Sequence, residues 1–197
     1  MFYSHLFTLP NHLTGKIRLH AKRADAQLSL FGKILTAHAL EHFGIPAQIM
    51  ERMTFDKFNR PFIPNIRFDF NISHSGKYVV CASSTSYKVG LDIEKISFID
   101  LSDFVAHLLP VERGMIESST RGLTELFFVW TKKEAVIKGD GRGIYVPLNT
   151  IDTSRPNVLL DDTCWFLTEI PIHEEYVCHL ATNSPLHENV MLVELRI

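Results

Sequence analysis

The clearest helical pattern in the chain lies over about residues 22–43. Apolar side chains recur there every three or four residues, at Leu28, Phe31, Leu35 and Ala39. This spacing places them on one face of an α-helix. Gly44 and Pro46 follow directly and favour a stop. The pattern therefore predicts a long helix near the start of the chain.

Alternating patterns predict strands in the next part of the chain. Residues 66–72 alternate strictly between apolar and polar side chains, which is typical of a strand with one buried face. We expect this strand to end in a polar turn at 73–76, with further strands at 78–83 and 89–96. Helical segments are predicted between about 100 and 138, the last of them over 123–138 with Gly139 as its C-cap. Four strands are expected after it: 143–146, 164–168, 176–182 and 190–195.

These elements indicate an α+β fold in which helices pack on small antiparallel sheets. Segments 78–83 and 176–181 occupy comparable places in the two halves, so we expect two similar lobes that repeat one plan. The polar run at 84–87, between two predicted strands, is the best candidate boundary. This division gives an N-terminal lobe over 1–86 and a C-terminal lobe over 87–197, and the acidic residues considered next all lie in the second.

Two carboxylates lie one residue apart in the predicted strand 89–96. Side chains alternate along a strand, so Asp92 and Glu94 share a face, with Cα atoms roughly 6.5 to 7 Å apart. One interpretation is an antiparallel strand with one solvated side. The other is a pair of oxygen ligands for a hard cation such as Mg²⁺, which leaves positions for water and substrate phosphate.

A third carboxylate lies in the predicted helix over 123–138. Glu134 falls in the same arc as the apolar residues Leu126, Phe127 and Trp130, at about 100° per residue. An exposed ion pair with Lys138 would contribute only about 0.3 to 0.5 kcal/mol, too little to explain a charge on the apolar face. We therefore expect Glu134 to join the strand carboxylates as a metal ligand, with Lys133 and Lys138 beside it to bind phosphate oxygens.

Composition and charge narrow the class of protein. The chain has 197 residues, a formal net charge of -2 and 46% hydrophobic residues, which fits a globular protein and argues against a general nucleic-acid binder. The three cysteines have neither zinc-site nor disulfide spacing, so we expect reduced thiols and a cytoplasmic location. Neither a signal region nor a stretch long enough to span a membrane is predicted.

Three motifs in order resemble the surfactin-synthetase type of 4′-phosphopantetheinyl transferase. They are Asn-Ile-Ser-His-Ser at 71–75, Val-Gly-Leu-Asp-Ile-Glu at 89–94, and Trp-Thr-Lys-Lys-Glu-Ala-Val-Ile-Lys-Gly at 130–139 with Gly-Arg-Gly at 141–143. The resemblance is strong over about 60–148. It implies two similar α+β lobes with coenzyme A in the cleft between them. The implied reaction is transfer of the phosphopantetheine arm of coenzyme A to a serine of an apo acyl or peptidyl carrier protein, with release of adenosine 3′,5′-bisphosphate.

The resemblance also implies roles for individual residues. Asp92 and Glu134 would hold Mg²⁺ on the diphosphate, with Glu94 as a third ligand or a partner through water, and Glu134 would accept the serine proton. Lys138 completes the expected catalytic group. Residues expected to bind coenzyme A are Lys22, Arg23, Arg60, Ser73, His74, Lys133 and Lys138. Arg60 stands where the family commonly has the lysine of a Gly-Lys-Pro segment, and Glu112 is the nearest match to a further acidic residue.

We expect carrier proteins to dock near residues 101–120, where Leu108, Leu109, Val111 and Met115 are available, although a place in the core is the favoured interpretation for these side chains. A monomer is expected, because two lobes in one chain can complete a cleft. Two alternatives stay open. One is an idle relative that only binds coenzyme A or a carrier protein, and the other is a different Mg²⁺-dependent phosphotransferase, which would lack the usual glycine-rich phosphate loop here.

Overall fold

The first half of the molecule packs one long helix on a two-stranded sheet. In the computed structural model, which describes residues 23–187 and 189–195, helix α2 (Arg23–His42) covers one face of the antiparallel pair β3 (Asp69–Ser75) and β4 (Tyr78–Ser84). The connection holds a 3₁₀ helix, η2 (Ala47–Arg52), and the short pair β1 (Thr54–Phe55) and β2 (Pro61–Phe62). Leu40, Met50 and Phe70 form the centre of the core between helix and sheet.

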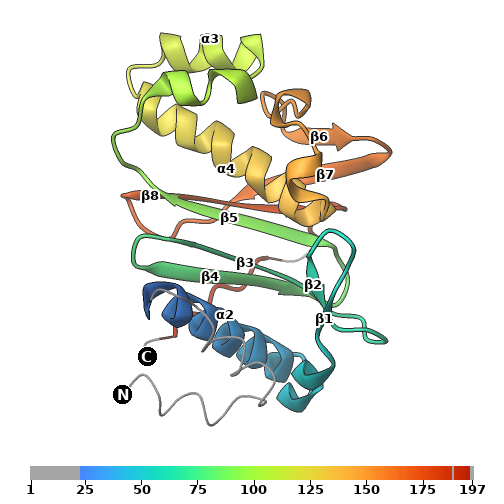
Figure 1. The fold of residues 1–197 in the computed structure, drawn as a ribbon. Helices are drawn as coiled ribbons and strands as arrows, with labels where there is room; N and C mark the ends of the chain where they lie inside the picture. Colours follow the sequence, from blue (N-terminus) through green and yellow to red (C-terminus); the bar gives the residue numbers. More distant parts are fainter. Residues whose placement is uncertain (1–22, 188, 196–197) are drawn as a thin grey trace.

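The second half is a four-stranded antiparallel sheet covered by helices. Its order is β5-β8-β7-β6, with β5 (Val89–Lys95), β6 (Asn157–Leu160), β7 (Thr163–Glu169) and β8 (Tyr176–Thr182). Helix α4 (Gly122–Asp140) crosses one face of this sheet, and α3 (Pro110–Ser118) packs on the far side of α4 (Figure 1). Four short 3₁₀ helices lie in the connections: η3 (Leu101–Asp103), η4 (Val105–His107), η5 (Gly143–Tyr145) and η6 (Leu148–Thr150).

Strand β5 lies where the two sheets meet. Its residues Leu91 and Ile93 belong to an apolar cluster that includes Val80 and Ala82 of β4. The alternate residues face α4, and the approach is closest at Gly90, where an added Cβ would lie 1.9 Å from the carbonyl oxygen of Ala135. The side of β5 that carries Asp92 and Glu94 is therefore held directly against α4.

The α+β architecture is confirmed, and α2, β4, β5, β7 and β8 lie close to their predicted ranges. Two predicted strands are wrong: residues 143–146 contain η5, and residues 190–195 have no regular secondary structure. Strand β6 was not predicted. Strand β3 begins later than expected and continues through residues 73–75, so the turn falls at 76–77 instead of 73–76.

The C-terminal end of α4 also differs from the prediction. The helix continues through Gly139 and ends at a C-cap formed by Gly141, whose φ of 94° is in the left-handed region that glycine adopts at low cost. Gly139 has a different reason to be glycine, because an added Cβ would lie 2.5 Å from the ring of Trp165. Among the described residues, no helix is both long and apolar enough to cross a membrane.

Candidate active site

Asp92 is the buried centre of the candidate site. Its side chain sits on β5 beneath α4, and the residue is only 2% exposed. Oδ1 accepts hydrogen bonds from Ser73 Oγ at 2.9 Å and from Lys138 Nζ at 2.5 Å. Oδ2 is buried and has no hydrogen-bond partner. Burial raises the pKa of Asp92, and the Lys138 ammonium works against that shift. A buried carboxylate oxygen without a partner is costly, so it calls for a ligand.

Glu94 lies one strand repeat further along the same side of β5. It is half-buried, and its Oε2 accepts a hydrogen bond from Ser75 Oγ at 2.8 Å. Burial raises the pKa of Glu94, the bond from Ser75 lowers it, and the negative charge of Asp92 raises it again. The two β5 carboxylates are thus close enough to repel one another.

Glu134 brings a third carboxylate to this group from α4. Burial raises its pKa, the Lys138 ammonium lowers it, and the charges of Asp92 and Glu94 raise it further. The structure therefore brings together the residues that the sequence proposed as metal ligands, with Lys138 as the cation beside them. Three carboxylates and one ammonium leave an excess of negative charge in a partly buried place.

The chemistry of these side chains suits a hard divalent cation. Among the described residues, no three His, Cys, Asp or Glu side chains are already arranged as a metal site. In the structure it is the ammonium of Lys138 that contacts Asp92. The unpartnered Asp92 Oδ2, the all-oxygen donor set and the excess negative charge nevertheless match what Mg²⁺ requires of a protein. Asp92, Glu94 and Glu134 are the residues that could hold it.

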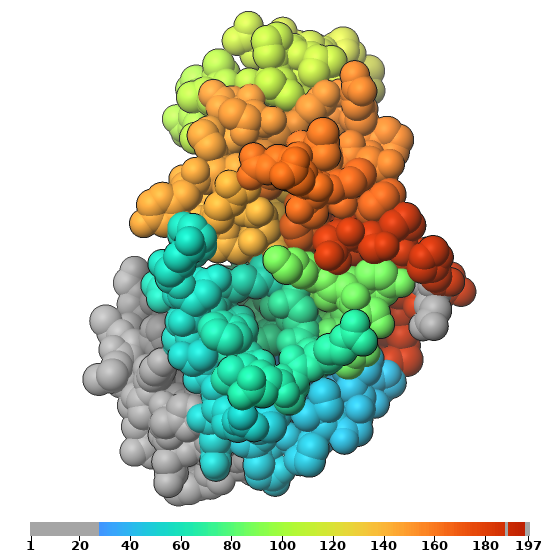
Figure 2. Space-filling view, turned by 90° about the vertical axis from the view of Figure 1, so that its right-hand side faces the viewer, coloured from blue at the N-terminus to red at the C-terminus, as the bar shows by residue number. Residues whose placement is uncertain are grey.

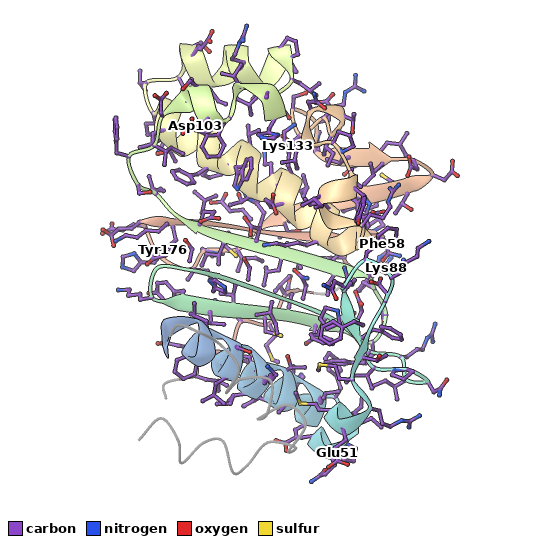
Figure 3. All side chains as sticks on the ribbon, in the orientation of Figure 1. Glu51, Phe58, Lys88, Asp103, Lys133 and Tyr176 are labelled. Carbon is purple, nitrogen blue, oxygen red and sulfur yellow. The ribbon has the colours of Figure 1, made fainter. Side chains whose placement is uncertain are left out.

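Lys133 does not take part in this site, which corrects the prediction that it binds phosphate. Its side chain is fully buried on the side of α4 that faces away from β5 (Figure 3). Nζ lies 2.7 Å from Oε2 of Glu112 and donates to the carbonyl oxygens of Leu148 and Ile151 at 2.9 and 2.7 Å. Glu112 also accepts from Thr153. The pair therefore fixes α3 and the segment after α4 to α4 itself.

Arg60 is likewise occupied by the protein. One of its guanidinium nitrogens bonds to Asp69 Oδ2 at 2.8 Å and to the carbonyl oxygen of Val89 at 2.9 Å. The other donates to the carbonyl oxygens of Lys138 and Gly139. These contacts join β3, β5 and the last turn of α4, and a role of Arg60 in binding coenzyme A stays a prediction. In Figure 2 the segment around residue 60 meets the segment that follows α4.

Of the other predicted ligands for coenzyme A, Ser73 and His74 point in opposite directions from β3. The Ser73 hydroxyl is buried against Asp92 and Lys138. It is therefore not open to a ligand, in contrast to the prediction that it binds coenzyme A. His74 is exposed, and by strand alternation it lies on the α2 side of the sheet. Lys22 lies outside the described residues, as does the side chain of Arg23.

Sequence reasoning missed two residues next to the carboxylates. Ser75 contacts Glu94 as described above. His179 of β8 lies directly across from Asp92 in the strand register and is buried, with Nδ1 2.7 Å from Thr131 Oγ1. Burial lowers the pKa of His179 to about 3, so the ring is neutral at physiological pH. Its place opposite Asp92 could have been found only by knowing that β5 pairs with β8.

Comparison with protein families covers both halves of the chain. Residues 88–186 match the family model described as the 4′-phosphopantetheinyl transferase superfamily, and residues 2–86 match the one described as 4′-phosphopantetheinyl transferase, N-terminal. The chain belongs to the 4′-phosphopantetheinyl transferase superfamily. The resemblance drawn from the three sequence motifs is therefore confirmed.

Individual relatives agree with this assignment. The chain is 36% identical over 131 residues to 4′-phosphopantetheinyl transferase gsp of Aneurinibacillus migulanus, which covers 64% of this chain and 53% of that protein. It is 30% identical over 138 residues to Sfp of Bacillus subtilis (strain 168), covering 68% and 61%. A third relative, a 4′-phosphopantetheinyl transferase of Bacillus subtilis, is 31% identical over 176 residues, covering 85% and 73%. The matches thus span about half to three quarters of these relatives.

Among solved structures, the chain is similar to the holo-[acyl-carrier-protein] synthase of Thermotoga maritima, with a TM-score of 0.38 and 13% identity. That match covers 48% of this chain and 61% of the other.

Proposed function

We propose that the protein is an Mg²⁺-dependent 4′-phosphopantetheinyl transferase. It would move the phosphopantetheine arm of coenzyme A to a serine of an apo acyl or peptidyl carrier protein and release adenosine 3′,5′-bisphosphate. The observation that carries this proposal is the group formed by Asp92, Glu94, Glu134 and Lys138, with an unpartnered carboxylate oxygen at its centre, in a chain of this superfamily. A protein that only bound coenzyme A would not need this costly concentration of charge.

The side chains divide the work as follows. Asp92, Glu94 and Glu134 would hold Mg²⁺, which when bound neutralises charge on the diphosphate. The ammonium of Lys138 lies at the same carboxylates and is placed to donate to a phosphate oxygen. A carboxylate oxygen of Glu134 would accept the proton of the serine hydroxyl. Burial and the neighbouring carboxylates raise the pKa of Glu134, so its carboxylate binds a proton more strongly than that of an exposed glutamate.

His74 and the start of α2 are the proposed site for the 3′-phosphate of coenzyme A. The first turn of α2 and the turn between β3 and β4 lie at the same end of the molecule (Figure 1). A helix N-terminus favours anions, and an exposed histidine can donate to one. His74→Ala should weaken coenzyme A binding about tenfold in calorimetry and leave binding of dephospho-coenzyme A unchanged. Equal losses for both ligands would exclude this role for His74.

The surface around α3 is the proposed docking site for the carrier protein. Val111 and Met115 are 51% and 45% exposed, and between them lies the exposed Arg113, which forms an ion pair with the exposed Glu117 at 3.6 Å. Leu108, which was also considered there, is 7% exposed and packs in a core cluster with Ile116 and Leu126, in agreement with the favoured interpretation that it lies in the core. We expect an acidic carrier protein to contact the residues that are exposed, Val111, Arg113 and Met115.

Both halves of the chain contribute to the site, because Ser73 and Ser75 come from the proposed lobe 1–86 and the carboxylates from 87–197. We therefore propose that a monomer is active, which light scattering during gel filtration would test.

Cys81, Cys164 and Cys178 are all unpaired, and this supports the proposed cytoplasmic location.

The deciding experiment combines the protein with coenzyme A, Mg²⁺ and an apo acyl carrier protein, and measures the mass of the carrier. Addition of one phosphopantetheine group is the expected result. Asp92→Asn and Glu134→Gln should each lower the rate by at least about 100-fold. The exposed controls Asp162→Asn and Glu175→Gln should keep it. Full activity in either site variant would remove the metal assignment, and coenzyme A binding without any turnover would favour an idle relative.

A further inference from the structure

Strand β5 is joined to β3 by side chains instead of by backbone pairing. One edge of β5 pairs with β8, which leaves the N–H groups of alternate residues on the other edge without a strand partner. Each of these donates to a side-chain oxygen of β3. The four bonds are Val89 to Asp69 at 2.7 Å, Leu91 to Asn71 at 2.9 Å, Ile93 to Ser73 at 3.4 Å and Lys95 to Ser75 at 2.9 Å.

The two serines in this ladder also donate hydrogen bonds to carboxylates of β5. Ser73 Oγ donates to Oδ1 of Asp92, and Ser75 Oγ donates to Oε2 of Glu94. A hydroxyl has one proton and two acceptor positions. Because a β5 N–H group already occupies an acceptor position of Ser75, the hydroxyl proton is free for the carboxylate. One serine therefore fixes both the strand and the orientation of Glu94.

We propose that Ser75 is a positioning residue for divalent-cation binding, because its hydroxyl holds the Glu94 carboxylate in the orientation in which it faces the cation. Groups that hydrogen-bond to metal-ligating carboxylates orient them, and their loss typically lowers metal affinity or activity about 10- to 100-fold. The inference rests on the proposed function, in which Glu94 is one of three carboxylates toward Mg²⁺. Ser75 is more informative than Ser73, since Ser73 also accepts from Lys138 and its removal would disturb two site residues.

The competing explanation is that Ser75 only replaces a strand partner for Lys95. The two explanations differ in what they predict for metal binding by the folded protein. Loss of a bond to the strand alone would lower thermal stability and leave the cation affinity unchanged. Loss of the bond to Glu94 would weaken the affinity measured on protein that is still folded.

Isothermal titration with Mg²⁺, and with Mn²⁺ as a second probe, tests the proposal directly. Ser75→Ala should raise the Kd for the cation about tenfold. Ser75→Thr retains a hydroxyl and should stay within about twofold of the wild type. Ser83→Ala, at a half-buried serine of β4 outside the ladder, should leave the Kd unchanged. Melting temperatures measured without metal show whether each variant is folded at the titration temperature.

The outcomes separate this inference from the proposed function. Wild-type protein whose cation binding is abolished by Asp92→Asn, combined with an unchanged Kd in Ser75→Ala, would overturn the role of Ser75 alone. A wild type without any Asp92-dependent binding would overturn the metal site itself, and the role of Ser75 with it. A tenfold weaker cation affinity in Ser75→Ala, together with nearly wild-type affinity in Ser75→Thr, would establish the positioning role of Ser75.

Discussion

At the scale of single residues, the charged side chains of the site favour cation binding and lower the stability of the metal-free protein. Glu134 has a raised pKa because it is partly buried and faces Asp92 and Glu94. The folded protein therefore binds this proton more tightly than the unfolded chain, and stability falls as the pH rises through the folded-state pKa. At a pH above the ordinary pKa of glutamate, Glu134 therefore makes the metal-free protein less stable than it is at low pH.

Replacing Glu134 by glutamine should consequently stabilise the metal-free protein while abolishing transfer. A gain of about 1 kcal/mol would raise the melting temperature by about 2–4 °C at pH 7. The gain should disappear below about pH 4, where glutamate is protonated in both the folded and the unfolded chain. Calorimetry in the presence of a chelator, at several pH values, measures this. A variant that is less stable at pH 7 would show that Glu134 has a structural role.

For the buried pair of Lys133 and Glu112 we predict the opposite effect, which is that removal of one charge destabilises the protein. Lys133→Met should destabilise the protein by about 3–5 kcal/mol, because it leaves the fully buried Glu112 carboxylate without its cation. Adding Glu112→Gln should recover much of this loss, and the double variant should bind coenzyme A like the wild type. Urea denaturation gives the stabilities, with Lys132→Met as the control that changes little. A specific loss of coenzyme A affinity in the double variant would contradict our assignment.

These two neighbours show what helical periodicity can and cannot reveal. Glu134 was recognised because one arc of α4 is apolar and a charge interrupts it. Lys133 was expected beside Glu134 as a phosphate ligand, since the pattern assumes that a helix has one buried side. Helix α4 is covered on both sides, by β5 and β8 on one and by α3 and the segment after α4 on the other. The second layer comes from other parts of the chain, so the pattern of α4 alone does not contain it.

At the scale of elements, the distance between α4 and β5 decides whether the carboxylates meet. Gly90→Ala would place a Cβ 1.9 Å from the carbonyl oxygen of Ala135 and 2.3 Å from the amide nitrogen of Gly139. These are backbone atoms, so the helix itself must shift. We expect a loss of at least about 2 kcal/mol in unfolding free energy and, in any folded protein, a strongly reduced transfer rate.

Gly114→Ala on α3 is the matched control for this substitution. No atom lies within 4 Å of an added Cβ there, and alanine should stabilise the helix by about 0.4–1 kcal/mol. Urea denaturation and the carrier-protein assay compare the two variants. Equal stability of Gly90→Ala and wild type would mean that α4 is not held against β5 as described.

Strands were predicted well where their apolar face is buried and poorly elsewhere. Strand β8 has the predicted limits, because it is buried along its whole length. The end of β3 was mistaken for a turn, since Ser73, His74 and Ser75 are polar on both faces. They stay in the strand because all three pair with residues of β4, and the two serines also bond to β5. Residues 190–195 are mostly apolar and still form no strand, which shows that an apolar run also needs a partner strand to pair with.

At the scale of the whole molecule, the two halves meet through an apolar cluster between β4 and β5 and through polar contacts that converge on the site. The ladder between β3 and β5 runs along one edge, and Arg60 joins β3 to β5 and α4 at its end. The sequence predicted two lobes and the carboxylates of the second. It did not predict that the first lobe supplies hydroxyl groups to those carboxylates, because bonds between segments distant in sequence depend on the packing of both halves.

The last prediction concerns Arg60, which was expected to bind coenzyme A and which bonds to β3, β5 and α4 in the structure. Its planar guanidinium reaches one carboxylate and three carbonyl oxygens, a set that an ammonium cannot match in geometry. Arg60→Lys should therefore lower the unfolding free energy by at least about 2 kcal/mol, since bonds to charged groups are worth about 1.5–3 kcal/mol each. The exposed control Arg52→Lys should cost little. Calorimetric Kd values for coenzyme A should be equal in both variants at a temperature where both are folded, and a tenfold weaker Kd at unchanged stability would instead make Arg60 a ligand.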